Sequence, residues 1–139
     1  MVRPIVLAAT MLLAGPASAQ KGVERWSATS TTAMSITGDI VLSPTRLTAA
    51  GRTLPLKVAA DVRGFGTDHG PVGARILKVT RPANPVLKNG NRLCTAPVRW
   101  VAVWREQTGD LGMAVFAGTR QPAREDVPGL CGTFLYSRP

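Results

Sequence analysis

Apolar and polar residues alternate over short stretches of this chain, and no stretch keeps apolar residues at helical spacing for three turns. Alternation with a period of two is typical of β-strands that bury one face. The 14 glycines and 11 prolines are spread along the chain rather than clustered, and these residues form turns and end strands. The pattern therefore predicts many short strands joined by turns, in an all-β fold.

The alternation begins after a segment rich in serine and threonine. Seven of the eleven residues in 27–37 are Ser or Thr. Within it, Thr32–Thr37 alternates with a period of two and predicts a strand. We expect residues 20–37 to lead into the fold and residues 38–139 to form a single β domain.

Further strands are expected where apolar runs lie between turn residues. The Asn89-Gly90 dipeptide prefers a two-residue type I′ turn and predicts a short hairpin between 86–88 and 91–93. Residues 63–71 hold four glycines or prolines in nine positions and are predicted to form a loop. The remaining expected strands are 40–42, 46–48, 53–62, 74–80 and 130–138, and 121–129 is expected to be a surface loop.

The clearest predicted hairpin lies in the C-terminal third. Val98–Glu106 and Leu111–Gly118 are strand-like runs, and the four residues 107–110 between them form the turn. This register places Trp104 opposite Met113. The face of the hairpin that carries Trp104 is assigned to the core, together with Trp100 and Ala102.

The opposite face of this hairpin is apolar as well. A sheet with one face in water alternates apolar with polar residues, so a second apolar face needs a cover of its own, from a loop, a partner or a ligand. We therefore take this face as the candidate binding face. Its residues are Arg99, Val101, Val103, Arg105, Ala114 and Phe116.

The first residues have the features of a secretory signal. Arg3 gives a positive start, residues 5–15 are apolar except for Thr10, and 17–19 offer the small residues that precede a cleavage site. The apolar run is far shorter than the roughly 20 residues that a membrane span needs. We expect residues 1–19 to be removed and the mature protein to be exported, soluble, and periplasmic or extracellular.

Export affects the interpretation of the two cysteines, Cys94 and Cys131. An oxidising compartment favours a disulfide between them. A metal pair or a reactive thiol is the alternative, but the only histidine is not near either cysteine in sequence. Three strands in chain order would place these cysteines on next-but-one strands, about 9 to 10 Å apart, whereas a disulfide needs Cα atoms within about 4.4 to 6.8 Å. Either residues 95–97 fold across the end of the sheet, or the last strand lies elsewhere.

These constraints fit a small antiparallel β-barrel or a two-sheet β-sandwich with one disulfide. In general outline the chain resembles the broad class of small exported barrels and sandwiches that includes protease inhibitors, lysozyme inhibitors and lipocalin-like carriers. This resemblance is one of architecture, which does not fix function. It carries over no motif residue.

The charge balance is basic but dispersed. Lys and Arg number 17 against 8 Asp and Glu, a net charge of +9. The basic residues after the signal fall singly, without the basic and aromatic interleaving of a nucleic-acid reader, so nucleic acid is not an expected partner. Binding to an anionic envelope polymer or to lipid headgroups through this charge is one alternative function.

Candidate catalytic groups are few. The only histidine, His69, follows Asp68 in the glycine-rich segment that also contains Phe65, and we name these three as candidate loop residues. No G-x-S-x-G motif places a serine nucleophile, Gly64-Phe65-Gly66 lacks the rest of a phosphate-binding loop, and no acidic cluster suggests a metal. A small hydrolase using His69 is the second alternative.

The leading hypothesis is a non-enzymatic exported binding protein of the bacterial envelope or periplasm. Its expected partner is a protein or a small amphipathic or acidic ligand, as for an inhibitor or a carrier, with no cofactor. A homodimer stays open as an alternative.

Overall fold

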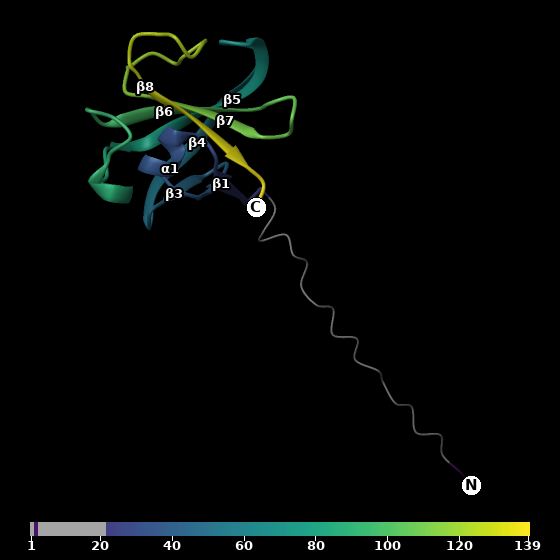
Figure 1. Ribbon diagram of the computed structural model, residues 1–139. Helices are drawn as coiled ribbons and strands as arrows, with labels where there is room; N and C mark the ends of the chain where they lie inside the picture. The colour runs from purple at the N-terminus through teal and green to yellow at the C-terminus, as the bar shows by residue number, and fades with distance from the viewer. Residues whose placement is uncertain (1, 3–21) are drawn as a thin grey trace.

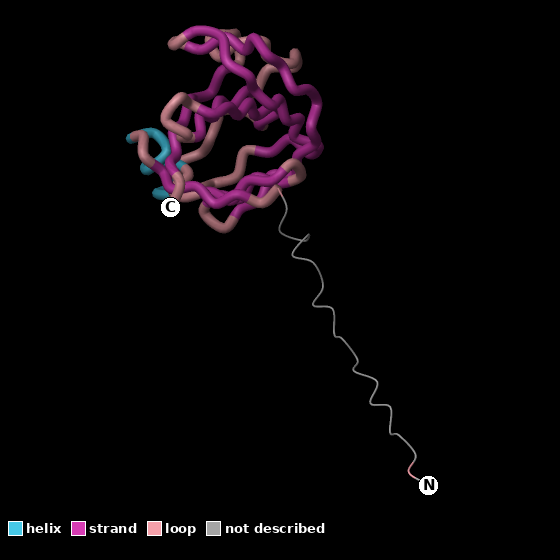
Figure 2. The backbone as a smooth tube through the Cα atoms, turned by 90° about the vertical axis from the view of Figure 1, so that its right-hand side faces the viewer, coloured by secondary structure: helices cyan, strands magenta, loops and turns pink. Residues whose placement is uncertain are grey.

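The strands of this protein close into an antiparallel barrel. The computed structural model describes Val2 and residues 22–139, so the expected signal segment lies outside the described residues except for Val2. Among the described residues, eight strands each pair with the next, and the last pairs with the first. Figure 1 shows their course and Figure 2 shows the ring that they form. The all-β prediction is confirmed, and of its two forms the barrel is the one observed.

The elements follow one another around the barrel in chain order. The strands are β1 Glu24–Ala28, β2 Ile40–Ser43, β3 Arg46–Ala49, β4 Arg52–Thr67, β5 Gly70–Ala83, β6 Val98–Arg105, β7 Leu111–Phe116 and β8 Leu130–Ser137. One short helix, α1 Thr31–Ile36, follows β1, and a 3-10 turn, η2 Lys88–Gly90, follows β5 in the described part of the chain.

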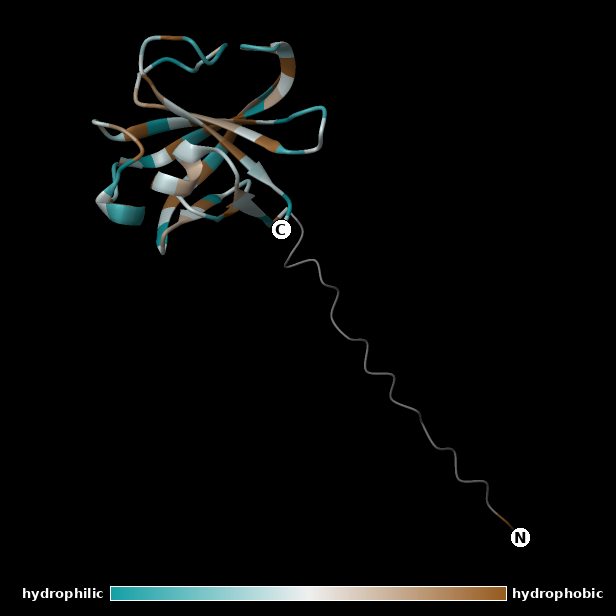
Figure 3. Ribbon diagram, in the orientation of Figure 1, coloured by the Kyte–Doolittle hydropathy of each residue, from teal (hydrophilic) through white to brown (hydrophobic). Residues whose placement is uncertain are grey.

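Inward-facing side chains fill the barrel interior. Along each strand, alternate residues point to the same face, and the colouring of Figure 3 shows this alternation of apolar and polar positions. The seam that closes the barrel pairs Ser27 with Ser137 and Ala28 with Tyr136. Interior residues with at most 2 % of their surface exposed include Trp26, Ile40, Leu47, Leu77, Val101, Val115, Phe134 and Tyr136.

A second apolar core lies outside the barrel wall, on the outer face of β5, β6 and β7. Its members are Phe65, Ala74, Ile76, Trp100, Ala102, Trp104, Ala114 and Phe116. The end of the β4–β5 ribbon covers this face, and the Phe65 ring lies 5.6 Å from that of Trp104 between centroids. Loop 117–129 packs against the ribbon, where the Glu125 N–H donates to the Gly66 carbonyl at 2.8 Å. The chain itself therefore covers both apolar faces of the β6–β7 hairpin.

The register of that hairpin differs by one residue from the predicted register. Trp104 pairs with Gly112 rather than with Met113. The connection spans 106–110 instead of 107–110, and Gly109 within it has φ 87°. A glycine with positive φ lets a hairpin loop take one residue more than a plain four-residue turn. Because a one-residue slip moves every β7 side chain to the other face, the predicted division of this hairpin into two faces was wrong.

The strand predicted over Thr32–Thr37 was also wrong, because this segment forms α1. The Ser30 hydroxyl accepts a hydrogen bond from the Ala33 N–H at 3.1 Å, which caps the helix. Ala33 is fully buried. Alternation over six residues is too short to distinguish a strand from a short helix that buries one residue.

The loop predicted over 63–71 is largely strand. β4 runs to Thr67 and β5 begins at Gly70, so only Asp68 and His69 remain in the turn. Two register shifts interrupt the ribbon, one before residue 60 and one before Phe65. Such bulges accommodate glycines within paired strands.

The hairpin predicted around Asn89-Gly90 is a turn without flanking strands. Both residues have the positive φ that the dipeptide favours, 57° and 74°. The preceding Leu87 N–H donates to the Asn91 carbonyl at 2.7 Å. The Asn91 side chain donates to the Ser35 carbonyl of α1 at 2.9 Å, so this turn packs against the helix instead of joining two strands.

The predicted disulfide between Cys94 and Cys131 is confirmed, with Cα atoms 5.0 Å apart. Because β6, β7 and β8 do lie side by side in chain order, the segment before β6 folds across the sheet end, the first of the two alternatives. The Asn84 side chain donates to the Cys94 carbonyl at 2.6 Å and helps to hold that segment. No helix in the described part of the chain is long and apolar enough to cross a membrane.

Candidate functional site

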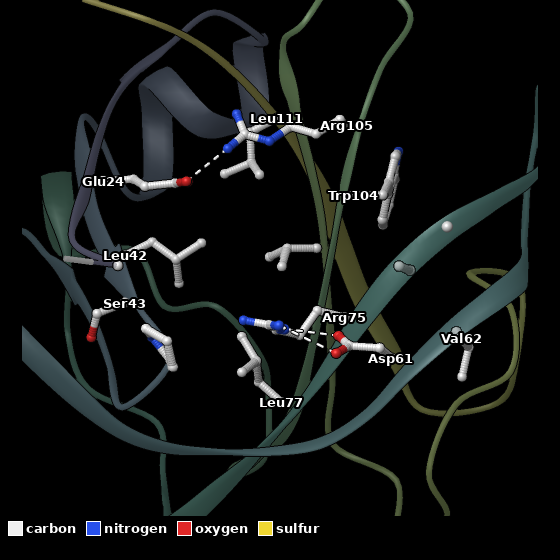
Figure 4. A pocket seen from close by; sticks show the side chains of 15 residues that line it. Glu24, Leu42, Ser43, Asp61, Val62, Arg75, Leu77, Trp104, Arg105 and Leu111 are labelled. Atoms are coloured by element: carbon white, nitrogen blue, oxygen red, sulfur yellow. Dashed lines mark hydrogen bonds and ion pairs between the residues drawn. The ribbon is translucent and has the colours of Figure 1, made fainter.

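A cavity of about 420 Å³ opens at the barrel end where β2 and β6 finish and β1 and β7 begin. We call it the mouth cavity (Figure 4). Its lining residues are Gly22, Glu24, Leu42, Ser43, Pro44, Asp61, Val62, Gly73, Ala74, Arg75, Leu77, Val103, Trp104, Arg105 and Leu111.

The floor of the mouth cavity is apolar and its rim is charged. Leu42, Leu77, Val103 and Leu111 belong to the barrel core and form the floor. Side chains two residues apart share a face of a strand. The inward position after Val103 is therefore Arg105, and the one before Leu77 is Arg75. The inward-facing side chains of β5 and β6 thus change from apolar to charged where these strands reach the mouth.

Glu24 and Trp26 hold Arg105 on one side of the rim. The Glu24 carboxylate accepts a hydrogen bond from Trp26 Nε1 at 3.0 Å and one from Arg105 Nη2 at 2.7 Å. The Arg105 guanidinium carbon lies 4.4 Å from the centre of the Trp26 ring, and that of Arg138 lies 5.1 Å from it. Stacking on an aromatic face and a carboxylate contact together restrict how an arginine can turn.

A second ion pair, between Asp61 and Arg75, lies on the other side. Asp61 accepts from Arg75 Nε at 2.8 Å and from Nη2 at 3.2 Å. This hydrogen bonding holds the pKa of the Asp61 carboxyl below its usual value and raises the pKa of Arg75. A guanidinium has five N–H donors, so both arginines keep donors that Asp61 and Glu24 do not use. Figure 4 shows the two guanidinium groups reaching the cavity from different sides.

The arrangement suits an apolar group with a hydrogen-bond acceptor beside it. Small-molecule sites are concave, mostly apolar, a few hundred Å³ in volume, and carry a few placed polar groups. The mouth cavity fits this description, with two guanidinium groups as the placed donors. Arg75 and Arg105 are each paired with a carboxylate, so the positive charge of both arginines at the cavity is partly neutralised.

The structure does not bring the six residues of the predicted binding face together. Val103 and Arg105 line the mouth cavity, whereas Val101 is buried deeper in the barrel. Ala114 and Phe116 lie in the outer core, where loop 117–129 and the β4–β5 ribbon cover them. Arg99 is exposed and does not line the cavity.

The three candidate loop residues have separate environments. Phe65 is fully buried in the outer core. The Asp68 N–H donates to Glu125 Oε1 at 3.3 Å, and burial raises the pKa of the Glu125 carboxyl. His69 is exposed in the turn, and its own N–H donates to Thr67 Oγ1 at 3.3 Å.

Sequence reasoning missed Glu24, Asp61 and Arg75 as parts of a site. Glu24 and Arg75 could have been found from their spacing in the sequence. Each lies two positions before a core residue, Trp26 and Leu77 respectively, and therefore on the same face of its strand. For Asp61 a bulge between Val58 and residue 60 shifts the alternation, which hides its inward position. Among the described residues, no group of three or more His, Cys, Asp or Glu side chains is placed to hold a metal ion.

Comparison of the chain with protein-family models, curated proteins and solved structures finds no match.

Proposed function

We propose that this chain is an exported, non-enzymatic binding protein whose binding site is the mouth cavity. The occupant is an apolar group that carries an acidic or carbonyl oxygen next to it. The observation that carries this proposal is the cavity of about 420 Å³, with an apolar floor and two guanidinium groups at its rim.

The chemistry of the lining supports the class of ligand. Leu42, Leu77 and Leu111 offer an apolar surface that gains free energy when it leaves water. Arg75 and Arg105 offer N–H donors fixed by Asp61 and Glu24, and a fixed donor loses little entropy on binding. The disulfide fits an oxidising compartment, which supports the proposed export.

Displacement of a fluorescent anion tests this proposal. Anilinonaphthalene sulfonate combines an apolar ring system with an anionic group, and we expect it to bind mature protein and to be displaced by octanoate more effectively than by octanol. Replacing Arg105 with methionine is expected to weaken octanoate binding by about 1.5 to 3 kcal/mol, the typical worth of a hydrogen bond to a charged group.

A cavity-filling pair of variants locates the binding. A Cβ at Gly73, which lines the cavity, would meet only the Val62 carbonyl, at 4.0 Å, so Gly73→Trp has room to occupy the mouth. Gly64 has open space around it and does not line the cavity, so Gly64→Trp is the matched control. Loss of binding in the first variant alone supports the proposal. Equal binding by both variants contradicts it.

A further inference from the structure

We infer that residues 57–64 of β4 form a docking edge for an extended acidic segment of a partner protein. One apolar side chain of that segment lies in the mouth cavity. The inference rests on the proposed function, because it assigns the occupant of the same cavity. Two further observations support the inference independently of the proposed function. One is the free edge of β4, and the other is the pair of lysines, Lys57 and Lys78, that lies at this edge.

The free edge arises because β4 is much longer than β3. The pairing of β3 with β4 ends at Arg46 and Pro55, and the Leu56 N–H then donates to the Thr45 carbonyl at 2.8 Å. Beyond that point, among the described residues, β4 pairs with β5 alone until the bridge between Gly66 and Arg124. The N–H and C=O groups that this stretch turns away from β5 are therefore free to pair with an added strand.

The mouth cavity lies beside this edge. Pro44, in the turn between β2 and β3, lines one side of the cavity, and Asp61 and Val62 of β4 line another. A strand added to β4 therefore runs alongside the mouth. Side chains of a strand point alternately to its two faces, so one side chain of the added strand enters the cavity while its main chain pairs with β4. This division of roles, with main-chain bonds for affinity and a pocket for specificity, is typical of strand addition.

The charge of the edge identifies the partner as acidic. Lys57 of β4 lies directly opposite Lys78 of β5, and Lys78 lies opposite Trp100 of β6. Both lysines are exposed, and the Lys78 Nζ lies 5.9 Å from the centre of the Trp100 ring. Like charges directly opposite one another destabilise a sheet. Among the described residues, no carboxylate forms an ion pair with Lys57.

An acidic residue on the added strand would lie across from Lys57, in the same cross-strand row as Lys57 and Lys78. Its negative charge would offset the repulsion between the two lysines. Arg63 adds a second exposed positive charge near the other end of the edge. The one carboxylate on this stretch, that of Asp61, is already bound through two hydrogen bonds by Arg75. Within the described part of the chain, neither Lys57 nor Arg63 forms an ion pair, so the edge presents positive charge at both of its ends.

Two other occupants explain less of the structure. A second copy of the chain pairing edge to edge would bring two basic edges, each with its own Lys57 and Arg63, against each other. A small amphipathic acid would fill the cavity but would leave the free main-chain groups of β4 without partners.

Selection of displayed random peptides on the immobilised mature protein tests the inference. We expect the enriched peptides to be acidic and to alternate apolar with polar residues. A resynthesised peptide should newly protect from hydrogen exchange those amides of 57–64 that face away from β5. Methylating its backbone nitrogens at one set of alternate positions should abolish binding, while methylating the other set should preserve it, because only alternate groups of a strand face a given neighbour.

Charge variants provide the matched comparison. Lys57→Glu should weaken binding of the peptide by about two- to thirtyfold, since a cross-strand charge attraction becomes a repulsion of similar size. Lys88→Glu makes the same charge change in η2, which packs against α1, and should leave binding unchanged. Thermal unfolding of both variants confirms that they are folded.

Three results overturn the inference: no enriched acidic peptide, equal loss of binding with either methylation set, or a dimer in solution that Lys57→Glu dissociates. Displacement of the fluorescent anion from the mouth cavity reports separately on the proposed function. If octanoate binds and Gly73→Trp blocks it, while no peptide binds β4, then the function stands and the strand-docking inference fails. If neither ligand binds, both fail.

Discussion

Trp104 and Gly112 face each other across the β6–β7 ladder, and the indole ring of Trp104 occupies the space that a side chain at position 112 would need. The same indole packs on Phe65 in the outer core, lines the mouth cavity, and donates through Nε1 to Glu106 at 3.0 Å. Gly112 has no side chain, and this leaves room for the Trp104 indole. Trp104 in turn belongs to the outer core and lines the mouth cavity.

Gly112→Ala tests this relationship. A Cβ at position 112 would collide with the Trp104 ring, which would have to leave its site. We expect a loss of about 1 to 3 kcal/mol in the free energy of unfolding, the usual cost of overpacking a core, measured by urea denaturation. Gly64→Ala is the control, because a Cβ there meets nothing within 4 Å, and its effect should be small. A neutral Gly112→Ala would contradict the assigned packing.

The Thr37 and Tyr136 hydroxyls form a buried hydrogen bond at 2.8 Å that ties the end of α1 to β8. Replacing Tyr136 and replacing Thr37 should lower the free energy of unfolding by different amounts. Tyr136→Phe leaves the Thr37 hydroxyl with the nearby Ala33 and Gly38 carbonyls as acceptors, so we expect a loss of about 1 kcal/mol. Thr37→Val leaves the Tyr136 hydroxyl buried without its partner, at a cost of about 1 to 3 kcal/mol.

Urea unfolding of the two single variants and the double variant measures this difference. The double variant should cost less than the sum of the two, because the residues share one interaction. Strict additivity would show that the bond contributes nothing.

The Cys94–Cys131 disulfide closes a long loop, with a sequence separation of 37. In the chain-entropy account this is worth about 4 kcal/mol, because the cross-link restricts the unfolded chain. Replacing both cysteines with alanine should lower the free energy of unfolding by roughly that amount. A thiol reductant should destabilise the wild type and leave the double variant unaffected; equal sensitivity of the two proteins would contradict the assignment.

We expect Glu125 to make a pH-dependent contribution to stability. Burial raises the pKa of its carboxyl in the folded state, so folding favours the protonated form. The contribution is therefore fully present below the unfolded-state pKa of about 4.3, and it is lost as pH rises through the folded-state pKa. Glu125→Gln keeps an oxygen acceptor for the Asp68 N–H and removes the titration. As the pH rises above about 4, the melting temperature of Glu125→Gln should rise relative to that of the wild type. A difference that stays constant with pH would contradict a raised pKa at Glu125.

The sequence sufficed to predict the all-β class, the disulfide and most strand positions, because these follow from alternation, turn residues and the expectation of an oxidising compartment. It also indicated that the β6–β7 hairpin needs covers on two faces, which the barrel interior and the outer core supply. Local pattern alone did not separate a short helix capped by Ser30 from a strand, since the decisive contact is the burial of Ala33 against distant residues.

The candidate site was harder to predict. Its charged residues come from β1, β4, β5 and β6, so only the closed barrel brings them together. The bulge before residue 60 conceals the inward position of Asp61, and Gly109 shifts the β7 register by one residue. Each of these two local irregularities changes which side chains share a face, and the predicted binding face depended on regular alternation.

Mapping of octanoate by nuclear magnetic resonance shows where on the barrel the ligand binds. Protein spanning residues 20–139 and labelled with nitrogen-15 is titrated with octanoate, and the amide shifts are followed residue by residue. We expect the largest shifts on residues that line the mouth cavity, among them Glu24, Asp61, Arg75 and Arg105, and we expect Gly73→Trp to abolish these shifts. Shifts confined to α1, η2 or the outer core would contradict the claim that the mouth cavity is the binding site.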